Sequence, residues 1–358
     1  MKKILVIDDS ALMRKVLSDI IESDDRFHVE DTARNGVEGL NLLMQKKYDA
    51  VLLDINMPKM SGIELLEELH RRQIKANIIV VSTLVKDGTS ITIRALELGA
   101  FDFITKPVRY RDFMNSEYKT NLLNMLASAS MMQEPKKTVE QRKTVEQKKT
   151  TASVSGKNTG KKCISGKKLV ALACSTGGPR ALQSVLPKLS KDLDAPVMIV
   201  QHMPVGFTNS LAVRMDELSP LHVKEAEDGE QIKKGTVYIA KGGSQMRYVQ
   251  SDRISIKTGE IRNGLKPCAD IMYESLCLSD YDEIICVVLT GMGQDGTKGI
   301  QELSKSHNVY VIAQDEETST VYGMPRMIYE VGLADEVLPL GDIADAVMKK
   351  AGVRKNGC

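Results

Sequence analysis

Residues 3–22 read KILVIDDSALMRKVLSDIIE, a short apolar run followed by a longer amphipathic segment. The continuous run from Ile4 to Ile7 is typical of a buried strand, and it ends on the acidic pair Asp8 and Asp9. From Ser10 onward, apolar residues recur every three or four positions, as they do in a helix with one buried face. Over residues 10–22 we expect the buried face to consist of Leu12, Val16, Leu17, Ile20 and Ile21. A strand that leads directly into such a helix indicates an α/β fold with a parallel sheet.

The same alternation of strands and helices continues to about residue 129. Further strands are expected at 27–34, 49–53, 77–81 and 101–105. Further helices are expected at 37–45, 62–71, 88–98 and in the segment that ends near residue 129. Alternation of this kind predicts a parallel sheet that is covered by helices on both faces. We assign this first domain to residues 1–125.

A basic segment separates the first domain from the rest of the chain. The chain as a whole is nearly neutral, with 49 Lys+Arg and 47 Asp+Glu, but residues 131–168 contain eleven Lys or Arg and three Glu. The sequence KTVEQ occurs twice in it, at 137–141 and 143–147. Such a segment cannot bury enough apolar surface to fold, so we expect a flexible linker over 126–167. A patch that binds nucleic acid or an anionic membrane is the alternative, but no aromatic residues are interleaved.

The composition narrows the classes of function. Hydrophobic residues make up 42% of the chain, enough for sizeable cores, while aromatic residues make up 4% and Trp is absent. Few aromatics argue against stacking platforms for nucleotide bases. No apolar run approaches the roughly 20 residues of a membrane span, and the N-terminal run turns acidic too soon for a signal peptide. Six Cys without C-x-x-C spacing indicate reduced thiols. We therefore expect a cytoplasmic protein that neither inserts into membranes nor binds DNA.

Residues 168–350 predict a second and larger α/β domain. Its main strands are expected at 168–173, 196–200, 284–289 and 308–312, and a helix is expected at 179–189. Shorter strands with glycine turns are expected over 223–259. The alternation favours a doubly wound arrangement with a mostly parallel sheet.

Polar side chains of a particular kind follow four strands of the first domain. They are Asp8, Asp9, Asp54, Ser82, Thr83 and Lys106. Because the carboxyl ends of parallel strands meet at one edge of a sheet, we expect these side chains to converge. Three carboxylates repel one another unless a hard cation such as Mg²⁺ neutralises them, and a lysine with a hydroxyl suits a phosphoryl group. The set predicts a carboxylate that attacks a phosphodonor and forms an acyl phosphate. Taken singly, each residue could be a helix cap or a loop residue.

These residues, with LLDINMPKMSG at 52–62, resemble the receiver domain of two-component response regulators. The resemblance covers residues 1–120 and implies a flavodoxin-like five-stranded domain. It implies that Asp54 accepts a phosphoryl group from a histidine kinase. The Mg²⁺ ligands that it implies are Asp8, Asp9, Asp54 and the carbonyl of Asn56. The residues that it implies around the phosphoryl group are Lys106 and a reporting hydroxyl, either Ser82 or its neighbour Thr83.

Three polar residues follow apolar strands of the second domain. Ser175 lies in a glycine-rich turn between a strand and a helix, where a nucleophile is exposed and the helix N-terminus favours negative charge. His202 and Asp295 each follow another apolar strand, so all three residues reach the same edge of the sheet. A serine, a base and a carboxylate at one edge predict a nucleophilic triad. Singly, the turn could bind phosphate, the histidine could be structural and the aspartate could belong to an Asp-Gly turn.

Four motifs, ACSTGGPRAL, VQHMPVGFTNSLAVRM, KPCADIMYESL and VLTGMGQDGTKG, resemble the catalytic domain of the chemotaxis protein-glutamate methylesterases, the CheB family. The resemblance implies phosphorylation-activated hydrolysis of glutamate γ-methyl esters on chemoreceptor cytoplasmic helices, and deamidation of receptor glutamines. No cofactor is implied for the esterase step. The catalytic residues that it implies are Ser175 as nucleophile, His202 as general base and acid, and Asp295 as the group that orients the imidazole. The candidates for oxyanion stabilisation are the backbone of Met292 and the hydroxyl or backbone of Thr176. Ala173-Cys174 departs from the Gly-Ala that usually precedes the serine.

Two other functions are compatible with parts of the sequence. A response regulator that signals by binding alone would share the first domain but would leave Ser175, His202 and Asp295 unexplained. A DNA-binding regulator would use the basic linker, but no helix-turn-helix candidate follows the first domain.

Overall fold

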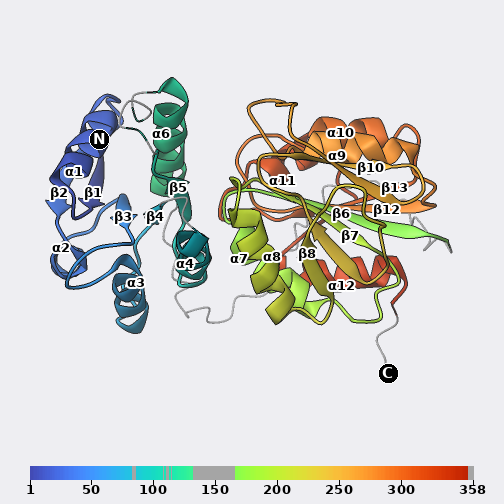
Figure 1. Ribbon diagram of the computed structural model, residues 1–358, viewed down its shortest axis with the longest axis horizontal. Helices are drawn as coiled ribbons and strands as arrows, with labels where there is room; N and C mark the ends of the chain where they lie inside the picture. Colours follow the sequence, from blue (N-terminus) through green and yellow to red (C-terminus); the bar gives the residue numbers. More distant parts are fainter. Residues whose placement is uncertain (83–85, 108, 110–112, 114, 132–165, 354–358) are drawn as a thin grey trace, which may run out of the picture.

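The chain folds into two α/β domains that lie side by side (Figure 1). The computed structural model describes residues 1–82, 86–107, 109, 113, 115–131 and 166–353. Within these ranges no helix is both long enough and apolar enough to span a bilayer. The last helix of the first domain, α6 (Ser116–Met131), extends past the expected domain boundary at residue 125. Most of the predicted linker lies outside the described residues.

The first domain contains a five-stranded parallel sheet in the order β2-β1-β3-β4-β5. Its strands are β1 (Lys2–Ile7), β2 (Phe27–Ala33), β3 (Ala50–Asp54), β4 (Ile78–Ser82) and β5 (Asp102–Thr105). Its other helices are α1 (Ala11–Glu22), α2 (Gly36–Gln45), α3 (Gly62–Arg71) and α4 (Lys86–Glu97). Side chains of α1 and α6 pack on one face of the sheet, and those of α2, α3 and α4 pack on the other. This strand order is that of the flavodoxin-like fold, which confirms the prediction.

Helix α1 starts where its sequence predicts but buries less of its first turn. Ser10 caps it, because Ser10 Oγ accepts the amide of Met13 at 3.3 Å. Four of the five residues expected on the buried face are buried, but Leu12 is 57% exposed, so that expectation was wrong. Strand β1 ends at Ile7, and the first turn of α1 therefore stands past the sheet edge, with no sheet beneath it to cover Leu12.

The second domain contains a seven-stranded sheet in the order β14-β13-β12-β6-β7-β9-β8, parallel throughout. Its strands are β6 (Lys168–Cys174), β7 (Val197–Gln201), β8 (His222–Glu225), β9 (Thr236–Ile239), β12 (Glu283–Val288), β13 (Val309–Gln314) and β14 (Glu336–Leu338). Its helices are α7 (Gly178–Val185), η1 (Leu186–Lys188), α8 (Phe207–Leu218), α9 (Ala269–Ser275), η2 (Leu276–Leu278), α10 (Thr297–Leu303), α11 (Met324–Glu330) and α12 (Leu340–Ala351). A separate antiparallel pair is formed by β10 (Gln245–Val249) and β11 (Arg253–Lys257).

The order of the strands reverses at the middle of this sheet. Helices α7, α8 and α12 cover one face, and α9, α10 and α11 cover the other. The chain runs outward from β6 through β7 and β9 on one side, then continues on the other side of β6 with β12 and β13. In doubly wound sheets a ligand crevice opens at the carboxyl ends of the strands where the order reverses. Here that point lies between β6 and β12, and the doubly wound prediction is confirmed.

The two domains are in contact through α4 and β5 of the first domain and α7 and α8 of the second. The ring of Phe103 in β5 stacks on the ring of Phe207 in α8, with centroids 4.5 Å apart. Glu97, at the end of α4, accepts a hydrogen bond from Arg214 Nε of α8 at 2.5 Å. The interface therefore combines an apolar stack with an ion pair.

A buried ion cluster lies at the amino ends of the two central strands of the second sheet, β6 and β12. Glu283, the first residue of β12, is fully buried and pairs with Lys168 at 3.1 Å and with Lys350 at 2.9 Å. Lys168 Nζ also donates to the carbonyl of Lys350 at 2.6 Å. The cluster therefore ties the last helix, α12, to the two central strands.

We expect the Glu283→Ala substitution to lower the free energy of unfolding by about 3–5 kcal/mol, because it leaves two buried lysines without their carboxylate. Glu302→Ala is the matched control, since Glu302 pairs with Lys305 on the surface of α10 and an exposed pair contributes less than about 1 kcal/mol. Urea unfolding of the full chain, followed by circular dichroism, measures both losses. Equal losses for the two variants would contradict the structural role of the cluster.

Candidate functional site

Acidic side chains gather at the carboxyl edge of the first sheet. Asp8 and Asp54 are buried there, whereas Asp9 is exposed. Oxygen atoms of the three carboxylates lie within 4.8 Å of one another. Lys106 Nζ lies 2.8 Å from Asp8 Oδ2 and 2.9 Å from Asp54 Oδ2. The structure thus brings together four of the side chains predicted for this pocket.

Burial and ion pairing shift the pKa values of this pocket in opposite directions, and burial is the largest single cause at both Asp54 and Lys106. Burial raises the pKa of Asp54 above its usual value, although the Lys106 ammonium opposes the shift. Burial also works against the charge of Lys106, but the two carboxylates outweigh it and raise the pKa of the lysine. One ammonium therefore neutralises only part of the charge of these carboxylates. Their other oxygen atoms are suitable ligands for a hard divalent cation. The three aspartates can hold Mg²⁺, and Asn56 lies exposed on the loop that follows Asp54.

Ser82, the last residue of β4, is buried beside this pocket and is bonded to α4. Thr92 Oγ1 lies 2.7 Å from Ser82 Oγ and 2.7 Å from the carbonyl oxygen of Gly88. Thr83, the other candidate for the reporting hydroxyl, lies outside the described residues. Thr92 was not predicted, because a threonine within a helix carries no signal of a contact with a distant strand.

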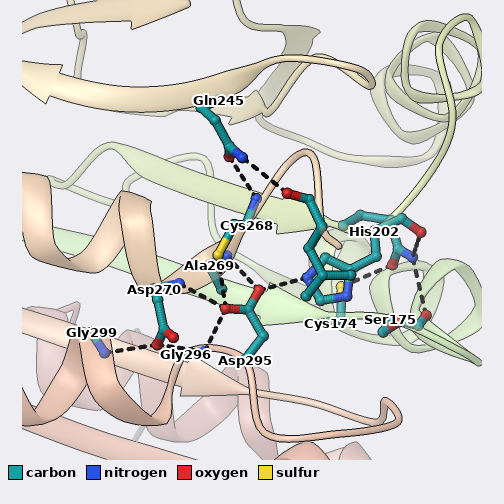
Figure 2. A network of polar contacts seen from close by, with 12 residues as sticks. Cys174, Ser175, His202, Gln245, Cys268, Ala269, Asp270, Asp295, Gly296 and Gly299 are labelled. Atoms are coloured by element: carbon teal, nitrogen blue, oxygen red, sulfur yellow. Dashed lines mark hydrogen bonds and ion pairs between the residues drawn. The ribbon is translucent and has the colours of Figure 1, made fainter. Parts of the chain in front are cut away.

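Ser175, His202 and Asp295 follow three neighbouring strands, β6, β7 and β12, at the point where the strand order reverses (Figure 2). Backbone hydrogen bonds hold their loops together. The amide of Ser175 donates to the carbonyl of Thr290 at 3.0 Å, and the amide of His202 donates to the carbonyl of Cys174 at 3.2 Å. The structure therefore places all three residues at one edge, as their positions after apolar strands predict.

Gly291 allows the loop after β12 to approach Ser175. A Cβ atom at position 291 would lie 2.8 Å from Ser175 Cβ and 2.5 Å from Met324 Sδ, both too close for a real side chain. The amide of Gly291 donates to the carbonyl of Val321 at 3.0 Å, which holds the loop in this position. The close approach therefore requires glycine at this position.

His202 and Asp295 form a buried pair. His202 Nε2 lies 2.7 Å from Asp295 Oδ2, and Asp295 is 4% exposed. Burial by itself would raise the pKa of Asp295, but the hydrogen bond and charge of His202, with two backbone amides, outweigh it and lower the pKa to about 2. Asp295 is therefore ionised at neutral pH and holds the imidazole through Nε2, which leaves Nδ1 as the second proton site of the ring.

Gln201 connects Ser175 to His202 through their backbones. Its Nε2 donates to the carbonyl of Ser175 at 3.0 Å and to that of His202 at 3.2 Å, and its Oε1 accepts the thiol of Cys174 at 3.0 Å. Among the residues that the structure describes, no hydrogen bond joins Ser175 Oγ to the imidazole, and such bonds often close only around a substrate. Gln201 was not predicted, although a polar residue that ends an apolar strand before a histidine is a usable signal.

The two residues predicted for oxyanion stabilisation both contact the first domain. The side chain of Thr176 lies close to the carboxylate of Asp102 in β5. Burial raises the pKa of Asp102 to about 6, and the nearby Thr176 side chain opposes this shift. Met292 is 43% exposed, and its Sδ accepts Ser128 Oγ of α6 at 3.5 Å. The first domain thus reaches residues that adjoin the Ser175 edge.

The first domain has an acidic pocket on a flavodoxin-like sheet, and the doubly wound second domain carries Ser175, His202 and Asp295 at one sheet edge. Together they define a response regulator whose second domain is a hydrolase. The chain matches the response regulator receiver domain family over residues 4–116 and the CheB methylesterase family over residues 170–347. A crystal structure of the Thermotoga maritima CheB methylesterase catalytic domain is 43% identical, with a TM-score of 0.49, and covers 52% of this chain and 99% of that one.

Two curated relatives match over nearly their whole length. The protein-glutamate methylesterase/protein-glutamine glutaminase of Symbiobacterium thermophilum is 39% identical over 98% of this chain and 97% of its own. The protein of the same name from Bacillus subtilis is 40% identical over 97% of this chain and 98% of its own. The chain belongs to the family of protein-glutamate methylesterases/protein-glutamine glutaminases.

We expect Lys106→Met to lower the free energy of unfolding of the first domain by about 3 kcal/mol at about pH 8, because two buried carboxylates lose their cation. The loss should shrink as the pH falls to about 5. The sign follows from Asp54, whose pKa is already raised, so that protonation removes the uncompensated charge. Urea unfolding at the two pH values measures the difference.

Lys15→Met is the matched control for this prediction. Lys15 pairs with Asp19 on the surface of α1, so its loss should stay below about 1 kcal/mol at both pH values. A loss for Lys106→Met that does not change with pH would contradict the prediction.

Proposed function

We propose that this protein hydrolyses glutamate γ-methyl esters on the cytoplasmic helices of methyl-accepting chemoreceptors, deamidates receptor glutamines, and is activated by phosphorylation. The observation that carries the proposal is the buried pair of His202 and Asp295 at the sheet edge where Ser175 emerges. The name shared by the two relatives supports a glutamate ester and a glutamine amide as the substrates. The reaction takes place in the cytoplasm, where these receptor helices lie.

Ser175 is the nucleophile of an acyl-enzyme mechanism. Its Oγ attacks the ester carbonyl carbon while His202 takes the hydroxyl proton at Nδ1, since Asp295 holds Nε2. The same nitrogen then protonates the methoxy oxygen, the carbon–oxygen bond breaks and methanol leaves. A water molecule, deprotonated by His202, attacks the acyl-enzyme, and the glutamate carboxylate is released as Ser175 regains its proton. With a glutamine substrate the leaving group is ammonia.

Asp295 orients the ring and stabilises the imidazolium without taking the proton itself, as its lowered pKa requires. Oxyanion stabilisation comes from the backbone of Met292 and from Thr176. The side chain of Thr176 lies beside the Asp102 carboxylate of the first domain, so we assign this role to its backbone amide first and to its hydroxyl once the domains separate.

Asp54 of the first domain is the phosphorylation site. A carboxylate oxygen attacks the phosphorus of a phosphohistidine on the histidine kinase of the chemotaxis system, and the phosphorus–nitrogen bond breaks to leave an acyl phosphate. The residues that would hold Mg²⁺ are Asp8, Asp9, Asp54 and the carbonyl of Asn56. When bound there, Mg²⁺ would neutralise charge on the phosphoryl oxygens. The residues that contact or detect the phosphoryl group are Lys106 and a hydroxyl, Ser82 or Thr83.

Ser82 links this pocket to the interface between the domains. Its hydroxyl oxygen accepts a hydrogen bond from Thr92 of α4, and a phosphoryl group on Asp54 offers a charged acceptor to the Ser82 hydroxyl proton. When Ser82 turns toward the phosphoryl group, Thr92 loses this partner and α4 can shift. Helix α4 holds α8 through Thr89 and Glu97, so its shift loosens the interface.

Before phosphorylation the first domain covers the edge that a receptor helix must reach. Asp102 of β5 holds the side chain of Thr176, next to the nucleophile. Val321, whose carbonyl accepts the Gly291 amide, packs against the hydrophobic cluster of α1 and α6. Both contacts lie on loops of the Ser175 edge, which supports inhibition by occlusion.

We expect Ser175→Ala to lower the rate of methanol release from methylated receptor fragments by at least about 1,000-fold, because no acyl-enzyme can form. Ser184→Ala on α7 is the matched control, because the Ser184 hydroxyl donates to the carbonyl of Arg180 within the same helix. The rate of this variant should stay within about twofold of the wild-type rate. The assay uses Mg²⁺ and a small phosphodonor. Wild-type rates in the Ser175→Ala variant would overturn the proposal, and no release by the unaltered chain would favour a regulator that acts by binding alone.

We expect the charge reversal Arg214→Glu to raise the activity of the unphosphorylated protein by roughly fivefold, which corresponds to about 1 kcal/mol of interface stability. The reversal Glu97→Arg should do the same, because the pair that joins α4 to α8 is lost in both. The double reversal restores the pair and should return the activity toward that of the unaltered chain. Additive effects of the two reversals would contradict inhibition through this interface.

A further inference from the structure

The first turn of α9 holds the carboxylate of Asp295. Its Oδ2 accepts the amide of Ala269 at 2.6 Å, in addition to the ring of His202 (Figure 2). Its Oδ1 accepts the amide of Asp270 at 3.0 Å and the thiol of Cys268 at 3.1 Å. These three donors belong to a different segment from the loop that carries Asp295. The orientation of this carboxylate therefore depends on how its loop lies against α9.

Asp270 makes the opposite connection. Its Oδ1 accepts the amide of Gly296 at 2.9 Å and the amide of Gly299 at 2.7 Å, and its side chain is buried. Both glycines follow Asp295 on the loop and first turn that lead into α10. Each of the two carboxylates thus accepts amides from the segment of the other. The loop cannot move away from α9 without breaking bonds at both aspartates.

Close backbone contact accompanies these bonds. A Cβ atom at position 299 would lie 2.6 Å from the carbonyl oxygen of Asp270 and 2.7 Å from its Cα. Gly296 has a φ of +94°, in the left-handed region that favours glycine. The separation between α9 and this loop is therefore set by direct backbone contact.

We propose that Asp270 is a positioning residue for ester hydrolysis, which holds the loop from β12 to α10 against α9 and so sets how Asp295 meets His202. The inference rests on the proposed function of these residues. Among the contacts of the described residues, none joins Asp270 to Ser175 or to His202, so it acts through Asp295. The thiol of Cys268 supports the same carboxylate from the other side of the turn.

Loss of the Asp270 carboxylate affects the reaction more than substrate binding. Without its Oδ1, the amide of Gly299 is buried without an acceptor, and the amide of Gly296 keeps only Asp295 Oδ1 at 3.0 Å. The loop therefore shifts to satisfy the Gly299 amide. Asp295 moves with the loop, and the imidazole loses its orientation. A misplacement of about 1 Å at a reacting group can lower the rate about 100-fold. Asp270 is 1% exposed and offers no surface to a receptor helix, so KM should change little.

The experiment compares variants of the full chain by methanol release from methylated receptor fragments. Asp270→Ala and Asp270→Ser remove or retract the acceptor and should lower kcat by about 10- to 100-fold, with KM within about twofold. Asp270→Asn keeps an acceptor oxygen in place and should stay within about fivefold. Asp335→Ala is the matched control, because Asp335 accepts the amide of Val311 near the amino ends of β13 and β14 and its loss should leave kcat unchanged.

The pH dependence separates positioning from a loss of stability. The acidic limb of kcat/KM should move further to lower pH in Asp270→Ala than in Asp270→Asn, because both variants lose the same charge but only the first displaces Asp295 from the imidazolium of His202. Other titratable neighbours do not change charge near neutrality. Burial raises the pKa of Cys268 to about 12 and that of Tyr273 well above its usual value, and an ion pair raises the pKa of Arg262.

The outcomes separate this inference from the proposed function. If Ser175→Ala still releases methanol at the wild-type rate, the proposed function fails, whatever the Asp270 variants do. If Ser175 is required but folded Asp270→Ala and Asp270→Ser keep the wild-type kcat and acidic limb, only the positioning role is overturned. If Asp270→Ala does not fold, Asp270→Ser decides in the same way. If neither folds, Asp270 is a residue of the fold and the proposal is wrong.

Discussion

The hydrogen bond between His202 Nε2 and Asp295 Oδ2 depends on several segments that are distant in the chain. A carboxylate that is 4% exposed loses most of its hydration, and this penalty must be offset by donors from the protein. Those donors come from His202 on one side and from the first turn of α9 on the other. Together they keep the pKa of Asp295 at about 2 and direct its charge at the imidazole. The proposed mechanism therefore requires β7, β12 and α9 to hold this arrangement.

Both domains build their sites by the same geometric rule. Parallel strands bring the residues that follow them to one edge of the sheet, so polar residues after apolar runs converge in space. In the first domain the rule assembles carboxylates around Lys106, and in the second it assembles Ser175, His202 and Asp295. The first domain also reaches this edge of the second, because β5 and α6 contact residues beside Ser175. In the proposed mechanism, a change of charge at Asp54 acts through Ser82 and α4 on the interface between α4 and α8.

Apolar runs and the residues directly after them predicted most of the fold and the main site side chains. A buried strand of four to seven residues leaves a strong apolar pattern in the sequence. The polar residue that directly follows such a strand must lie at the edge of the sheet. Leu12 shows where the pattern fails. Its helical spacing matches the buried face of α1, but spacing along one helix does not reveal where the sheet below it ends. The pattern did not predict the roles of Thr92 and Gln201 for a related reason, because their hydrogen-bond partners lie on other strands and loops.

The order of the amino acids alone indicates two α/β domains, the residues at their strand ends and the family motifs, because each is encoded within one strand, turn or helix. The packing of separate segments decides how those residues are held. Asp270 and Asp295 are joined by bonds across 25 positions of the chain, and Asp102 meets Thr176 across the boundary between the domains. Contacts of this kind depend on how two loops lie against each other, and that arrangement is set by the burial of strands and helices that neither loop contains.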